Sequence, residues 1–145
     1  MTVTKEFTFD MAHRLPNHEG KCKNIHGHTY KLQVTVEGSI KGVRSVGDSD
    51  EGMVIDFKQF KEIVNKFIND HLDHYYLSYS GDHAVNKFMR EQKFLLTVVD
   101  FIPTAENMVN WIEKELGQRF FRIGLSVFQI KLWETPTSFA TLYNN

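Results

Sequence analysis

The sequence is poor in several features, and each shortage excludes a class of protein. The chain has one cysteine among its 145 residues, so it cannot hold an internal disulfide. Its 17 basic and 18 acidic residues give a formal net charge of −1. That balance offers no electrostatic basis for binding nucleic acid or an anionic membrane. No apolar run approaches the roughly 20 residues that a membrane span needs.

The remaining composition is that of an ordinary globular enzyme or binding domain. Residues 1–6 lack the charged and then apolar layout of a signal peptide. Together with a free thiol, this favours a reducing, cytoplasmic location. A length of 145 residues and a hydrophobic content of 41% predict one domain, residues 1–145, with a core of its own.

Alternation of apolar and polar residues predicts four long strands, because side chains alternate across a strand. These strands span residues 3–13, 28–37, 121–134 and 138–143. Residues 38–52 carry glycine, serine and acidic residues without periodicity and are expected to form a loop. Residues 53–55 are expected to resume a short strand after it.

Helical spacing of apolar residues predicts two main helices. The first spans 57–69 behind Asp56 as its N-cap, and the second begins behind Thr104. Residues 82–92 favour a further short helix, and residues 94–99 a short strand. The order of the main elements predicts an α+β fold, with two helices on one face of a four-stranded antiparallel sheet.

Three histidines lie where the first two strands meet. His13 ends the first strand, and His26 and His28 begin the second at positions i and i+2, on one face. If these strands are antiparallel neighbours, the three imidazoles converge. Three nitrogens with an open fourth position is the layout of catalytic zinc. The alternative is that the three are core or turn histidines.

Two further groups could carry proton chemistry. Cys22 lies in a polar loop with lysines on either side, which favour its thiolate. It could instead be a buried small residue or a fourth zinc ligand. Asp73 and His74 form a carboxylate–imidazole pair that could serve as a general base, provided that they lie in a turn. The alternative for this pair is a surface cluster.

Glu134 and Thr104 are candidates for ligand binding. The apolar face that Phe128, Ile130 and Leu132 are expected to share continues to Glu134. A carboxylate at that position needs a partner, and the paired N–H donors of a guanidine-like ligand edge would satisfy it. Glu134 could equally be solvated beyond the end of the strand, and Thr104 could serve only as a helix cap.

Six segments together resemble the 6-pyruvoyl- and 6-carboxytetrahydropterin synthase family. They occur in the family's order and span nearly the whole chain. The most specific is a Cys-x-x-x-His-Gly-His motif with Ala-His-Arg-Leu upstream. The segments are Phe9 to Leu15, Cys22 to Tyr30, Met53 to Phe57, Leu72 to His74, Pro103 to Asn107 and Trp133 to Thr135.

The resemblance implies a tunnelling fold, in which three subunits join their sheets into a barrel and two trimers stack into a hexamer. It implies that zinc is held by the three histidines, and that Cys22, Asp73 and His74 form a catalytic triad. Glu134 would anchor the pterin ring, with Thr104 near the same ring. The active sites would lie between subunits. The candidates to meet a triphosphate are Arg14, Lys21 and Lys23.

The three-residue spacer in the Cys-x-x-x-His-Gly-His motif is similar to that of the bacterial 6-carboxy branch. That branch converts 7,8-dihydroneopterin triphosphate to 6-carboxytetrahydropterin, acetaldehyde and triphosphate, and supplies queuosine synthesis. Residues 79–101 are longer than the compact bacterial pattern, and the loop 42–52 is extended and acidic. These two departures leave a 6-pyruvoyltetrahydropterin synthase as the alternative. A zinc hydrolase and a zinc-stabilised purine- or pterin-binding module without turnover are more remote alternatives.

Overall fold

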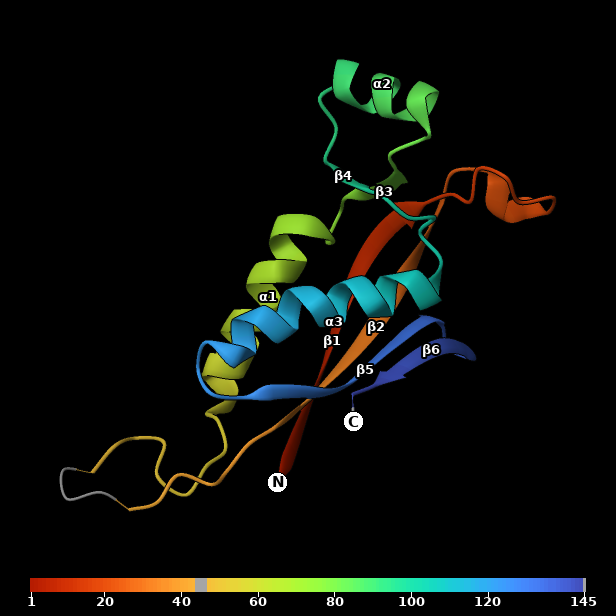
Figure 1. Ribbon diagram of the computed structural model, residues 1–145. Helices are drawn as coiled ribbons and strands as arrows, with labels where there is room; N and C mark the ends of the chain where they lie inside the picture. The colour runs from red at the N-terminus through yellow and green to blue at the C-terminus, as the bar shows by residue number, and fades with distance from the viewer. Residues whose placement is uncertain (44–46, 145) are drawn as a thin grey trace.

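A six-stranded mixed sheet forms the frame of the chain in the computed structural model, which describes residues 1–43 and 47–144 (Figure 1). The strand order is β4-β3-β1-β2-β5-β6. The pairs β1–β2, β2–β5 and β5–β6 are antiparallel, whereas β1–β3 and β3–β4 are parallel. The strands are β1 (Thr2–His13), β2 (His26–Glu37), β3 (Tyr76–Tyr79), β4 (Leu96–Val99), β5 (Ser126–Thr135) and β6 (Ser138–Tyr143).

The four expected antiparallel strands are present, but a four-stranded sheet was an incomplete prediction. The two additional strands, β3 and β4, have only four residues each. Tyr76, Leu77 and Ser78 of β3 are all buried, so this strand shows no alternation of polar and apolar residues. Strands buried on both faces lack that signal, as is usual where pairing is parallel. Strand β4 lies wholly within residues 94–99, where a short strand was expected.

Two long helices cover one face of this sheet, as expected (Figure 1). Helix α1 (Phe57–His71) begins behind Asp56, whose side chain accepts from the Lys58 amide at 2.7 Å. Helix α3 (Ala105–Phe121) begins behind Thr104, whose hydroxyl accepts from the Asn107 amide at 3.4 Å. The expected short helix is α2 (His83–Glu91), which lies beyond β3 and β4, away from the main layer.

The core fills the space between the two long helices and the sheet. The inward residues of β1 and β2 alternate with outward ones and are at most 7% exposed. Rings from the helices close over them, with Phe60 of α1 and Phe120 of α3 at a centroid distance of 5.2 Å. The same alternation continues to the ends of the strands and turns His13, His26 and His28 toward the helix side. The inward residues are Phe7, Phe9, Met11, Tyr30, Leu32, Val34 and Val36.

Two irregularities interrupt β5. Thr35 pairs with Gln129 and Val36 with Val127, so Phe128 has no opposite residue in β2. The expectation that Phe128 shares the face of Ile130 and Leu132 was therefore wrong. Phe128 is 36% exposed, whereas Ile130 and Leu132 are fully buried. Against β6, Trp133 pairs with Phe139 and Thr135 with Ser138, which leaves Glu134 as the extra residue of a bulge.

The segment 53–55 does not form the expected short strand. The Lys41 amide donates to the Met53 carbonyl at 2.9 Å, and the Met53 amide donates to the Asp50 carbonyl at 3.1 Å, but these contacts do not form a strand. Val54 and Ile55 are nevertheless buried, because they pack against the core. The described part of the loop 38–52 is free of helix and strand, and residues 44–46 lie outside the described residues. No helix in the described ranges combines the length and apolarity of a membrane span.

Candidate active site

The three histidines meet at the end of the β1–β2 pair. His13 lies directly opposite His26 in the strand register, and His28 follows two residues later on the same face. The ring centroids are 4.7 Å apart for His13 and His26, 5.4 Å for His13 and His28, and 5.0 Å for His26 and His28. One nitrogen from each ring lies within 4.8 Å of the others, a spacing that one metal ion can bridge.

The outer nitrogens of two rings are held by backbone carbonyls. His13 Nδ1 lies 2.8 Å from the Pro103 carbonyl, and His26 Nδ1 lies 2.8 Å from the Asn24 carbonyl. A carbonyl can only accept, so each Nδ1 carries the proton and each Nε2 presents its lone pair. Carbonyl partners of this kind orient metal-binding imidazoles. His28 Nε2 is buried and has no hydrogen-bond partner among the described residues. A zinc ion would satisfy it, so the donor set fits that metal.

Burial also favours the metal-binding form of the rings. It lowers the pKa of His13, against smaller opposing effects of the Pro103 carbonyl and Glu134. Burial likewise lowers the pKa of His28. A lowered pKa means that these imidazoles are neutral at pH 7, and a neutral imidazole is the form that binds a metal.

Glu134 lies against this cluster. Its Oε1 atom is 3.3 Å from His13 Nε2 and 3.7 Å from His28 Nε2. The Tyr30 hydroxyl lies 3.4 Å from the same oxygen and donates to it. Burial, followed by the charge of Glu134, raises the pKa of Tyr30, so this hydroxyl keeps its proton. Tyr30 is absent from the expected site residues, although its parity with His28 places it on the same face.

A pocket of about 300 Å³ is lined both by His13 of the histidine cluster and by the expected thiol. It brings together His13, Cys22, Thr104 and Glu134, which come from four separate segments of the chain. Cys22 lies in a short 3-10 helix, Lys21–Lys23, and is half-buried. Glu106, in the first turn of α3, also lines the pocket and was not expected there. The pocket therefore holds a thiol, a carboxylate and an imidazole within one small volume.

Asp73 and His74 form the expected pair, but in a different hollow. They lie in the turn after α1, where His74 has a positive φ of 63° and its Nδ1 is 3.1 Å from Asp73 Oδ1. The Asp10 amide also donates to Asp73 Oδ1, at 3.1 Å. His74 lines a hollow with Asp10 and His28 that does not include Cys22. Within one chain, the structure does not bring this pair to the thiol.

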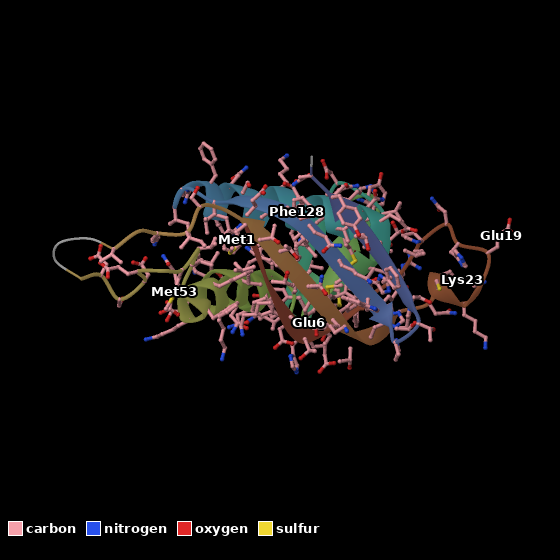
Figure 2. The ribbon with its side chains drawn as sticks, turned by 90° about the horizontal axis from the view of Figure 1, so that it is seen from below. Met1, Glu6, Glu19, Lys23, Met53 and Phe128 are labelled. Atoms are coloured by element: carbon pink, nitrogen blue, oxygen red, sulfur yellow. The ribbon has the colours of Figure 1, made fainter. Side chains whose placement is uncertain are left out.

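Of the three candidates for binding a triphosphate, Arg14 is already engaged. Its guanidinium forms two hydrogen bonds with Asp82, the residue before α2. Lys21 and Lys23 lie in the exposed loop beside Cys22, which projects at the opposite end of the molecule from Met53 (Figure 2). The two lysines remain candidates, whereas Arg14 has a structural partner.

The three-histidine cluster and the adjoining pocket, at the end of an α+β sheet, have the donor set and the spacing of a metal-binding enzyme site. The family model for 6-pyruvoyl tetrahydropterin synthase matches residues 2–145. The chain belongs to this family.

Curated relatives give the same assignment. A Haemophilus influenzae protein named 6-carboxy-5,6,7,8-tetrahydropterin synthase is 39% identical over 140 residues, covering 94% of each chain. A Rickettsia bellii protein of the same name is 31% identical over 146 residues, covering 94% of this chain and 95% of the relative.

Solved structures share the fold. An uncharacterized protein from Wolinella succinogenes matches with a TM-score of 0.77 and 26% identity, covering 100% of this chain and 98% of the other. The 6-pyruvoyl tetrahydropterin synthase of Caenorhabditis elegans matches with a TM-score of 0.69 and 22% identity, covering 100% and 96%. The tunnelling fold implied by the sequence resemblance agrees with these neighbours, with a six-stranded rather than a four-stranded sheet.

Proposed function

We propose that this chain is a zinc-dependent lyase that converts 7,8-dihydroneopterin triphosphate to 6-carboxy-5,6,7,8-tetrahydropterin, acetaldehyde and triphosphate, as in queuosine synthesis. One observation carries the proposal: His13 of the histidine cluster borders the same pocket as Cys22 and Glu134. The names of the curated relatives support the 6-carboxy product.

Zinc would be held by the Nε2 atoms of His13 and His26 and by a ring nitrogen of His28. Bound there, it would supply Lewis acidity toward the side-chain hydroxyls of the substrate and so stabilise negative charge on them. The protein contributes ring orientation through the Pro103 and Asn24 carbonyls, which keep the Nε2 lone pairs directed inward.

Cys22 would remove a proton from the substrate side chain as a thiolate. It lines the pocket beside His13, so a substrate bound between them would place its reacting carbon near the sulfur. Because Cys22 is half-buried, the sulfur is both reachable and partly shielded from water.

Asp73 and His74 would act from a neighbouring subunit. The Asp73 carboxylate contacts His74 Nδ1, which fixes the ring and leaves Nε2 to exchange a proton. Since His74 and Cys22 line separate hollows of one chain, a complete triad would draw on a second copy. A barrel-forming hexamer, a dimer of trimers, would provide that copy.

Glu134 would orient the pterin ring, with Thr104 on the same wall of the pocket. The bulge in β5 leaves Glu134 outside the regular ladder with β6, and bulges of this kind commonly aim a side chain into a site. A carboxylate facing the 2-amino and N3 edge accepts two hydrogen bonds and fixes the ring in one orientation.

Incubation of the zinc-loaded protein with 7,8-dihydroneopterin triphosphate, followed by product mass, tests the proposal. The expected products are the 6-carboxy pterin, acetaldehyde and triphosphate. A 6-pyruvoyl product would assign the chain to the other branch. Phosphate release without change to the pterin side chain would indicate a hydrolase, and tight binding without any product would indicate a binding module.

A further inference from the structure

An ion pair between distant segments lies beside the pocket. Arg14 follows His13 at the end of β1, and Asp82 precedes α2, 68 residues later. Arg14 Nε donates to Asp82 Oδ2 at 2.6 Å, and Nη2 donates to Oδ1 at 2.7 Å. The Asp82 side chain is 5% exposed and that of Arg14 is 26% exposed. Such a two-point contact between ions fixes both side chains in one geometry.

Asp82 is committed to this contact rather than to its own helix. Aspartate in the N-cap position usually accepts from the first amides of the helix. At α2 no such side-chain hydrogen bond forms, and both carboxylate oxygens face Arg14 instead. Tyr76 is the neighbouring titratable group, and burial followed by Asp82 raises its pKa to about 12. Tyr76 is therefore neutral at pH 7, and Arg14 balances the buried charge.

The remaining arm of Arg14 reaches the loop that carries the thiol. Nη1 donates to the carbonyl of Lys23, the residue after Cys22, at 3.2 Å. Leu15, which follows Arg14 in the chain, donates a hydrogen bond from its amide to the Cys22 carbonyl at 2.8 Å. Two consecutive residues that directly follow β1, Arg14 and Leu15, thus hold the backbone around Cys22. One of the two contacts depends on the orientation of the guanidinium, which Asp82 sets.

We propose that Asp82 is a positioning residue for Cys22, which acts by holding Arg14 against the Cys22 loop. The proposal rests on the catalytic role of Cys22 proposed above. It gives a function to the long segment 79–101, which supplies the carboxylate. Without that carboxylate the guanidinium rotates into solvent, the contact with Lys23 is lost, and the sulfur is no longer fixed beside the histidines. A displacement of about 1 Å at a reacting group can lower a rate roughly 100-fold.

Asp82→Asn and Asp82→Ala test the proposal in the zinc-loaded protein. Asparagine has the same shape as aspartate, so Asp82→Asn still tests the proposal if Asp82→Ala fails to fold. We expect kcat to fall roughly 10-fold to 100-fold, with KM for the pterin and bound zinc within about twofold of wild type. Glu115→Gln is the matched control, because it breaks an Arg–carboxylate pair within α3, with Arg119 Nη1 3.0 Å from Glu115 Oε2, away from the pocket.

The thiol provides a second readout that needs no turnover. Cys22 is the only cysteine of the chain, so alkylation by iodoacetamide reports this position alone. At a pH where the thiol is fully ionised, a released loop exposes the sulfur, and we expect the alkylation rate to rise severalfold in both Asp82 variants but not in Glu115→Gln.

A double variant tests whether Asp82 acts through Arg14. In an Arg14→Ala background, Asp82→Ala should change kcat and the alkylation rate less than twofold. Unchanged kcat and unchanged alkylation in the Asp82 variants, with only a lower melting temperature, would overturn the proposal. An undiminished Asp82 effect without Arg14 would also overturn it. If the wild-type protein shows no turnover, the proposed function is refuted. The role of Asp82 is then still decided by the comparison of alkylation rates.

Discussion

His26→Ala separates a metal ligand from a structural histidine. His26 is half-buried, and the hydrogen bond of its ring to the described residues joins Nδ1 to the carbonyl of the exposed Asn24. Removing one such bond costs about 1 kcal/mol. The metal-free variant should therefore unfold within about 1 kcal/mol of the metal-free wild type, because the sheet and core are left intact.

The effect on metal binding should be much larger. Changes to groups that only orient a ligand already cost about 10-fold to 100-fold in affinity, so loss of a ligand should cost at least about 100-fold. At free zinc 100 times the wild-type Kd, the wild type gains about 2.7 kcal/mol of stability from the metal. A variant that binds 100-fold more weakly gains only about 0.4 kcal/mol at that concentration. Thermal unfolding with and without zinc should show this difference.

Competition with a chromophoric chelator measures the affinity directly. His83→Ala is the matched control, since His83 is an exposed histidine at the start of α2, outside the metal cluster. It should bind zinc as the wild type does. Wild-type affinity in His26→Ala would refute the assignment of His26 as a ligand, as would an equal loss of affinity in His83→Ala.

Three other variants examine the site and the core. Cys22→Ala should keep bound zinc but lose turnover by about 100-fold to 10,000-fold, the range for a proton-transfer group; loss of zinc would make Cys22 a ligand. Glu134→Ala should weaken pterin binding at least about 10-fold in calorimetry while zinc content is unchanged; unchanged pterin affinity would return Glu134 to a solvated role. Phe60→Ala, at a fully buried position, should lower the free energy of unfolding by about 3–5 kcal/mol in urea, whereas Phe57→Ala, at a ring 53% exposed, should cost far less.

Local periodicity predicted the parts of the site that lie on regular strands. Parity alone places His26 and His28 on one face, and the antiparallel pairing of β1 and β2 sets His13 opposite His26. Both N-caps were also predictable, because Asp56 and Thr104 precede clear helical patterns and their side chains accept from helix amides. That the cluster binds zinc remains a prediction.

Contacts between distant segments were beyond the reach of these patterns. The Pro103 carbonyl that holds His13 is 90 residues away, and Asp82 is 68 residues from Arg14. Neither partner can be identified from its neighbouring residues, because every residue has a backbone carbonyl and most aspartates occur in similar local sequences. Strand β3 was missed because burial on both faces removes alternation. Phe128 was misplaced because a bulge shifts parity without a marker such as glycine.

The position of His13 connects the histidine cluster to segments that lie much later in the chain. Its backbone pairs with His26 on one side and with Leu77 on the other, and its ring is held by Pro103. His13 shares the β1–β2 hairpin with His26 and His28, but its pairing with Leu77 and its ring contact with Pro103 involve segments from the second half of the chain. Long-range pairings of this kind form late in folding. Zinc bound to the complete cluster would therefore oppose the opening of β3 and of the segment before α3, and we expect it to protect their amides from hydrogen exchange.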